Sequence, residues 1–210
     1  MEKILMIHRD SRMRSGRTAL LLVDMQTVWM HPCDKNDAAY FTTRNATLAV
    51  PNQQRLLQGA RNAGLDVLHT IIRSLRSDGR DRSLDHKLTP IHIAPDDPAG
   101  DIIPELTPRQ DEIVLPKTSS GVFNSTNIDY ILRNLGTDHL VIAGQLTDQC
   151  VDMAVRDAAD RGYRVLLAED ACATYSQDRH DAALRAFGGY CVVTSTSDIL
   201  ARIEEIETDV

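Results

Sequence analysis

Short runs of apolar residues alternate with longer amphipathic segments along most of the chain. Residues 18–24, TALLLVD, form an unbroken apolar run that ends in a charge, as expected of a strand covered on both faces. Residues 51–64 follow, with proline in the first turn, an apolar stripe and a final glycine, which predicts a helix. Residues 65–72 return to the strand pattern, so the first two strands are expected to be parallel and joined by a helix.

The same alternation continues to the C-terminus. Further strands are predicted at residues 112–116, 139–144, 163–170 and 191–195, and further helices at 125–135, 148–162, 178–189 and about 197–206. Residues 73–111 are charged, contain prolines and lack a strong period, which indicates either a functional loop or short elements that the pattern cannot resolve. The pattern predicts one α/β domain, a three-layer sandwich with a six-stranded parallel sheet flanked by helices.

Composition excludes several classes of function. The 210 residues carry 23 Lys and Arg against 30 Asp and Glu, a net charge of −7, which disfavours binding to nucleic acid. No apolar run approaches the roughly 20 residues that span a bilayer, so no membrane association is expected. The first residues lack the pattern of a secretory signal, and the four cysteines are scattered. We therefore expect free thiols in the cytoplasm rather than a disulfide framework.

Polar residues follow several of the predicted strands. Asp24 ends the first strand, Arg73 follows the second, Lys117 follows the third, and the sequence GQLTDQCV at 144–151 follows the fourth. The carboxyl ends of parallel strands meet at one edge of the sheet, where ligands bind. A single polar residue at a strand end has an ordinary structural explanation. An acid, a cation and a thiol at one edge indicate a reactive site.

Cys150 lies in the predicted first turn of a helix that Thr147 or Asp148 could cap. Unpaired backbone N–H groups and the helix dipole favour a thiolate there, and a nearby Lys117 would lower the thiol pKa further. The same N–H groups could receive the oxyanion of a tetrahedral intermediate. The alternative is that Cys150 is a small buried residue of the helix.

Other chemistry has weaker support. Cys172 also follows a strand, and a thiol redox protein that uses Cys150 and Cys172 remains an alternative. The histidines show none of the usual metal-ligand spacings, and the first strand is not followed by a glycine-rich phosphate loop. We therefore expect neither a metal nor a cofactor.

Three segments carry a family resemblance: LLLVDMQ, LPKTSSGVF and AGQLTDQCVDMAVRDAADRGYRVLLAEDACAT. In this combination and order the chain resembles the isochorismatase-like cysteine hydrolases, from about residue 17 to 210, with residues 1–16 left as an N-terminal arm. The resemblance implies that family's Rossmann-like fold with six parallel strands. It also implies that Cys150 is the nucleophile, Asp24 the general base and proton shuttle, and Lys117 the cation.

The resemblance further implies a cis peptide between Gln145 and Leu146, with backbone N–H groups of this loop and of Cys150 facing the oxyanion. Gln145 and Phe123 would line the substrate pocket. Family members that act on the vinyl ether of isochorismate lack the cysteine, whereas those that cleave C–N bonds need it. The chain thus resembles hydrolases of ureidoacrylate, N-carbamoylsarcosine and biuret.

The activity implied is hydrolysis of a small amide, ureido or carbamoyl substrate through a thioester acyl-enzyme, with release of ammonia or an amine. Arg73 is the first candidate to bind a substrate carboxylate, although Arg76, Arg80 and Arg82 share its charged loop and could simply pair with neighbouring acids. The resemblance favours a homo-oligomer, because members of the family commonly form dimers or tetramers. The apolar residues 4–7 also favour one. A non-catalytic binding or scaffold protein on the same fold is the other alternative.

Overall fold

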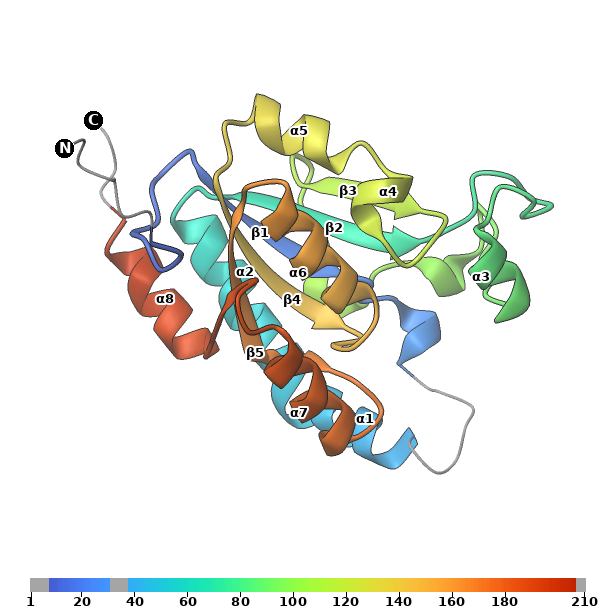
Figure 1. Ribbon diagram of the computed structural model, residues 1–210. Helices are drawn as coiled ribbons and strands as arrows, with labels where there is room; N and C mark the ends of the chain where they lie inside the picture. Colours follow the sequence, from blue (N-terminus) through green and yellow to red (C-terminus); the bar gives the residue numbers. More distant parts are fainter. Residues whose placement is uncertain (1–7, 31–37, 207–210) are drawn as a thin grey trace.

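One sheet of six parallel strands forms the centre of the protein (Figure 1). The structure is a computed structural model that describes residues 8–30 and 38–206. The strands are β1 (Thr18–Val23), β2 (Asp66–Ile72), β3 (Ile113–Lys117), β4 (His139–Gln145), β5 (Arg164–Ala173) and β6 (Val192–Thr194), and they lie in the order β3-β2-β1-β4-β5-β6. The predicted number of strands and their parallel pairing are confirmed.

Helices cover both faces of this sheet. They are α1 (Ala38–Arg44), α2 (Val50–Asn62), α3 (Leu84–Leu88), α4 (Val122–Ser125), α5 (Ile128–Asn134), α6 (Cys150–Asp160), α7 (Gln177–Ala186) and α8 (Thr196–Glu204). Short helical turns lie at η1 (Thr27–Trp29), η2 (Asn45–Ala49), η3 (Pro98–Gly100) and η4 (Pro104–Leu106). Helices α2 and α8 lie on one face, and α4, α5, α6 and α7 on the other, which gives the predicted three layers (Figure 1).

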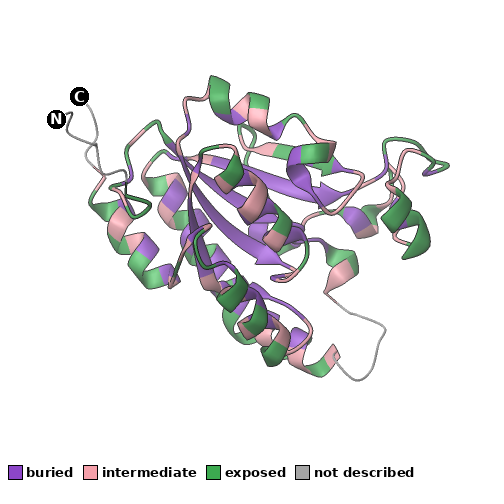
Figure 2. Cartoon of the chain, in the orientation of Figure 1, coloured by how far each residue is buried: buried purple, intermediate pink, exposed green. Residues whose placement is uncertain are grey.

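The central strands are mainly apolar because each face of the sheet has its own core. Leu21 and Val23 of β1 point into the cluster beneath α5 and α6, whereas Leu20 and Leu22 point into the cluster beneath α2 and α8. Side chains alternate along a strand, so a strand covered on both sides needs apolar residues at every position. Figure 2 shows this pattern, with buried central strands and helices that are buried on one side only.

The strand order places the site. Chain connections run outward from β1 in one direction and from β4 in the other, so the carboxyl ends of these two adjacent strands form the crevice in which open α/β sheets bind ligands. β1 and β4 approach closely there, because a Cβ atom on Gly144 would lie 2.3 Å from the carbonyl oxygen of Val23. Glycine at this position lets the two strands meet next to Asp24.

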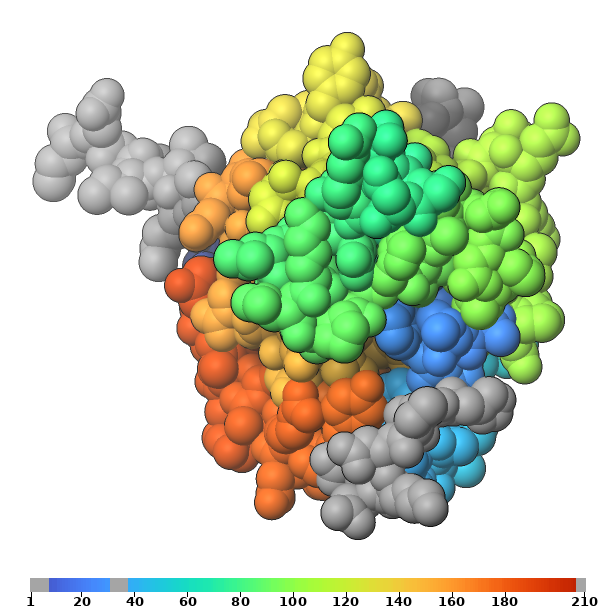
Figure 3. Space-filling model, turned by 90° about the vertical axis from the view of Figure 1, so that its right-hand side faces the viewer, coloured from blue at the N-terminus to red at the C-terminus, as the bar shows by residue number. Residues whose placement is uncertain are grey.

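Two regions differ from the prediction. Residues 73–111 hold α3, η3 and η4, each three to five residues long, which is too short to produce a recognisable period. Helix α1 and the π-helical turn η2 precede α2 and were not predicted. Figure 3, which views the carboxyl edge of the sheet, shows the 73–111 connection in green, the chain after β1 in blue and the chain after β5 in orange meeting on one face.

Candidate active site

A buried ion pair joins the ends of β1 and β3. The Lys117 ammonium lies 2.8 Å from Oδ2 of Asp24, and the two side chains are 0% and 3% exposed. Oδ1 of Asp24 accepts a hydrogen bond of 2.8 Å from the Thr70 hydroxyl, and the Asp24 main chain has a φ of 56°, a left-handed conformation that few residues other than glycine adopt. Together these contacts fix the carboxylate at the start of the crevice.

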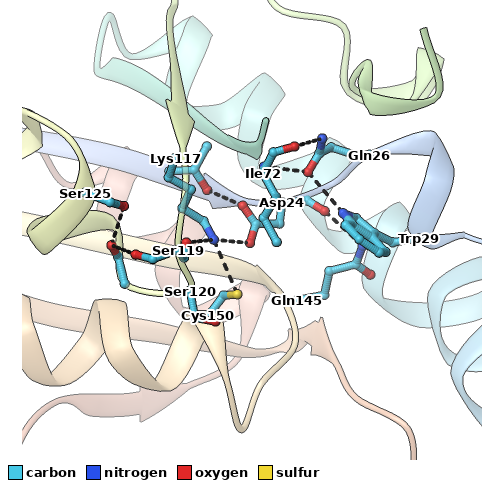
Figure 4. A network of polar contacts seen from close by, with 12 residues as sticks. Asp24, Gln26, Trp29, Ile72, Lys117, Ser119, Ser120, Ser125, Gln145 and Cys150 are labelled. Carbon is cyan, nitrogen blue, oxygen red and sulfur yellow. Dashed lines mark hydrogen bonds and ion pairs between the residues drawn. The ribbon is translucent and has the colours of Figure 1, made fainter. Parts of the chain in front are cut away.

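The Lys117 ammonium contacts three groups within this site. Besides Asp24, it donates to the main-chain oxygen of Ser119 at 3.0 Å and to Sγ of Cys150 at 3.4 Å (Figure 4). Burial disfavours the ammonium, but the negative charge of Asp24 and the Cys150 sulfur outweigh this cost, so the pKa of Lys117 is raised. Lys117 therefore remains charged.

Cys150 is the first residue of α6, and its thiol is buried beside this ion pair. Burial raises the pKa of Cys150 to about 12; the Lys117 ammonium opposes the shift and the Asp24 carboxylate adds to it. The sequence argument for a thiolate considered the helix terminus and Lys117 but not burial or the neighbouring carboxylate. In the free protein the Cys150 thiol is therefore neutral and lies near the Asp24 carboxylate.

The loop between β4 and α6 is held by main-chain and side-chain hydrogen bonds. The Gln145–Leu146 peptide is cis, as the resemblance implied. Gln145 donates from Nε2 to the main-chain oxygen of Asp24 at 3.0 Å, and Thr147 N–H donates to Ala173 at 3.0 Å. Among the described residues, no backbone acceptor is found for the N–H groups of Leu146 and Cys150.

The predicted side-chain caps of α6 are wrong. Gln149 occupies the cap position without a side-chain hydrogen bond. The Thr147 hydroxyl instead lies 3.0 Å from Nδ1 of His180, and Asp148 accepts hydrogen bonds from Thr174 and Arg179. Both side chains tie the loop to the segment that follows β5, which local sequence could not reveal.

A cavity opens onto Cys150 at this edge of the sheet. It measures about 80 Å³ and is lined by Asp24, Trp29, Phe41, Ile72, Ile91, Ser120, Gln145, Leu146, Gln149, Cys150 and Tyr175. Gln26 fixes one wall, since its Oε1 accepts from the indole N–H of Trp29 and from the Ile72 amide (Figure 4). Cys150 and Asp24 therefore face a small, largely apolar chamber.

Two predicted substrate contacts lie elsewhere. Arg73 donates to Asp101 at 2.8 Å and to the main-chain oxygen of Asp97, and it does not line the cavity. Phe123, on the short helix α4, packs in the core with its ring centroid 6.1 Å from that of Tyr163, and it does not line the cavity. Gln145 does line the cavity, as expected.

The aromatic residues that line the cavity were not predicted from the sequence. Trp29, the only tryptophan, lies five residues after Asp24 and returns to the site through the turn η1. The rings of Phe41 and Tyr175 pack at a tilt of 41° with their centroids 5.2 Å apart, although 134 positions separate them in the chain. The loop that follows the first strand was the one signal that could have indicated Trp29.

The remaining candidates are placed as follows. Cys172 lies in β5, fully buried and with a free thiol, and burial raises its pKa to about 12. His180 is buried beside Thr147 and Arg44. The apolar patch at residues 4–7, His31 and Cys33 lie outside the described residues.

Residues 18–198 match the family model of the isochorismatase domain. The chain belongs to the isochorismatase family. Among curated members of that family, it is 31% identical to the ureidoacrylate amidohydrolase RutB of Variovorax paradoxus, over 76% of this chain and 69% of that protein. It is also 31% identical to the streptothricin hydrolase of Streptomyces noursei, over 75% of this chain but only 50% of the relative.

Solved structures of isochorismatase-family proteins share the fold. A cysteine hydrolase from Pseudomonas syringae pv. phaseolicola superposes with a TM-score of 0.82 and 28% identity, over 93% of this chain and 96% of the other. N-carbamoylsarcosine amidase from Thermoplasma acidophilum gives a TM-score of 0.68 and 27% identity, over 86% and 96% of the two chains.

Two further findings concern the described residues alone. They contain no helix long and apolar enough to cross a membrane. They also contain no group of three His, Cys, Asp or Glu side chains arranged to hold a metal ion.

Proposed function

We propose that this isochorismatase-family protein is a cysteine amidohydrolase that cleaves the C–N bond of a small amide or ureido substrate through a thioester. The observation that carries the proposal is the contact of one buried ammonium, Lys117, with both the Asp24 carboxylate and the Cys150 sulfur, at 2.8 and 3.4 Å, beside a cavity. A nucleophile within reach of a base that a third group orients is the arrangement expected for covalent catalysis.

In the first half of the reaction the Cys150 thiol gives its proton to Asp24 as the sulfur attacks the carbonyl carbon. The S–C bond forms while the carbonyl π electrons move to oxygen, and the N–H groups of Leu146 and Cys150 donate to that oxyanion. The tetrahedral intermediate then collapses. Its C–N bond breaks, and protonated Asp24 gives the proton to the departing nitrogen, which leaves as ammonia or an amine.

In the second half Asp24 acts as a base again. It takes a proton from a water molecule whose oxygen attacks the thioester carbonyl, and the same two N–H groups hold the second oxyanion. The S–C bond breaks as the acid product leaves, and the Cys150 sulfur recovers its proton from Asp24. One carboxylate therefore handles every proton transfer, without a cofactor.

Lys117 has two functions in this scheme. It pairs with Asp24 in the free enzyme, so a negative carboxylate persists in a buried site where it would otherwise be costly. When the proton moves from Cys150 to Asp24, the negative charge moves to sulfur, and Lys117 already donates to that atom. The cation contacts the charge both before and after the transfer.

The test is ammonia release from a panel of small amides and ureido compounds, measured with wild type, Cys150→Ala, Asp24→Asn and the matched control Cys191→Ala. Cys191 is a free buried cysteine outside the cavity lining, so its variant should keep wild-type activity. Cys150→Ala should release no ammonia, and Asp24→Asn should lose about 10²–10⁴-fold in rate. Activity in Cys150→Ala would refute the mechanism, and an inactive wild type across the panel would refute the function.

A further inference from the structure

The cavity beside Cys150 has the walls of a site for an uncharged group. Six of its eleven lining residues are aromatic or aliphatic, and among the residues described no lysine or arginine lines it. The six are Trp29, Phe41, Ile72, Ile91, Leu146 and Tyr175. We infer that the substrate's acyl group is neutral and apolar, in contrast to the carboxylate-bearing acyl group that a ureido or carbamoyl acid would leave on sulfur after loss of ammonia. This inference rests on the proposed amidohydrolase function and specifies its substrate class.

Lys117, the cation that contacts the lining residues Asp24 and Cys150, is engaged with other groups. It forms an ion pair with Asp24 at 2.8 Å and donates to the main-chain oxygen of Ser119 at 3.0 Å and to the Cys150 sulfur at 3.4 Å. Its charge is balanced by Asp24, so the pair presents no net positive charge to the cavity. Recruiting Lys117 for a substrate carboxylate would remove it from the atoms that react.

The guanidinium groups of the 73–111 connection are engaged elsewhere. Arg73 pairs with Asp101, and Arg76 and Arg80 both pair with Asp78. Arg82 donates to the main-chain oxygens of Gly79 and Ile91. These four arginines are the groups that the sequence offered for a substrate carboxylate, and none of them lines the cavity.

Five of the residues that line the cavity are polar or reactive: Asp24, Ser120, Gln145, Gln149 and Cys150. The walls formed by the other six are aromatic or aliphatic. A carboxylate placed against those walls would lose its water without gaining an ion pair, and a buried charge without a partner is strongly disfavoured. An alkyl or aryl group in the same place would bury apolar surface against Trp29 and Tyr175, which favours binding.

The test compares two substrates of nearly equal shape that differ in charge. Succinamate carries a carboxylate where 4-methylpentanamide carries an isopropyl group, and both present the same primary amide. We expect wild-type kcat/KM for 4-methylpentanamide to exceed that for succinamate by at least 100-fold, measured as ammonia release at pH 7 and low salt. Equal values, or a preference for succinamate, would overturn the inference.

Two variants locate the preference in these walls. Trp29→Ala should raise KM for 4-methylpentanamide about tenfold or more. The control Tyr130→Ala removes an exposed aromatic ring outside the cavity and should leave KM unchanged for both substrates. Ile91→Arg introduces a cation into the lining and should reduce the ratio of kcat/KM for 4-methylpentanamide to kcat/KM for succinamate. If Trp29→Ala leaves KM unchanged and Ile91→Arg leaves the ratio of the two kcat/KM values unchanged, the inference is wrong.

If the wild type hydrolyses neither of these two substrates nor any amide of the panel, the proposed amidohydrolase function itself is wrong.

Discussion

The Asp24–Lys117 pair allows a quantitative test of how charge is held in this site. Lys117→Met removes the ammonium and keeps the length of the side chain, leaving the Asp24 carboxylate buried at 3% exposure without its partner. Breaking a buried pair from one side costs about 3–5 kcal/mol of folding free energy. Lys117→Met with Asp24→Asn removes both charges and should recover about 2 kcal/mol or more of that loss.

Urea unfolding at pH 7, followed by circular dichroism, measures both variants. The matched control is Arg76→Met, which breaks a pair with Asp78 that is about half-exposed on each side. Exposed pairs contribute only about 0–1 kcal/mol, so this control should stay within about 1 kcal/mol of wild type. A Lys117→Met protein that is equally close to wild type, or a double variant no more stable than Lys117→Met, would refute the reasoning.

Three further predictions concern the frame of the site. Gly144→Ala should lower the melting temperature far more than the control Gly189→Ala. At Gly144 φ is 130° and a Cβ would lie 2.3 Å from the Val23 oxygen, whereas at Gly189 φ is 90° and nothing lies within 4 Å of a Cβ. Equal losses of melting temperature would contradict the close approach of the strands at Gly144. Burial lowers the pKa of His180 to about 4, so the unfolded state takes up protons first as pH falls from about 6.5, and roughly 3 kcal/mol of stability should be lost by pH 4. In urea unfolding, the free energy of unfolding of His180→Gln should fall less between pH 6.5 and pH 4 than that of the wild type. The same pH dependence in both proteins would contradict this prediction. Because burial raises the pKa of Cys150 to about 12, its alkylation by iodoacetamide should keep accelerating up to pH 10, and a plateau below pH 8 would show a thiolate in the free enzyme.

The sheet could be predicted because its strands carry a strong local signal. β1 and β4 are buried on both faces, so each is an unbroken apolar run ended by a glycine or a charged residue. Asp24, Lys117 and Cys150 could be placed at one edge because parallel strands deliver their carboxyl ends together. The position of these three residues at one edge therefore followed from the order of the elements.

The chamber around those groups could not be predicted in the same way. Phe41 and Tyr175 meet across 134 positions, and Arg73 turns to Asp101 within a loop that has no period. The pKa of Cys150 also depends on burial and on Asp24, which a helix-terminus argument does not contain. Contacts between segments that are distant in the sequence determine these features, so they could not be predicted from the local sequence.

The central claim is that Cys150 carries the acyl group during amide hydrolysis. Intact-mass spectrometry of enzyme quenched with acid during turnover tests it most directly, with any amide from the panel that the wild type hydrolyses. We predict a mass increase equal to the acyl group, located on the peptide that contains Cys150 and absent from Cys150→Ala. Turnover by Cys150→Ala, or an acyl group attached to another residue, would contradict the account.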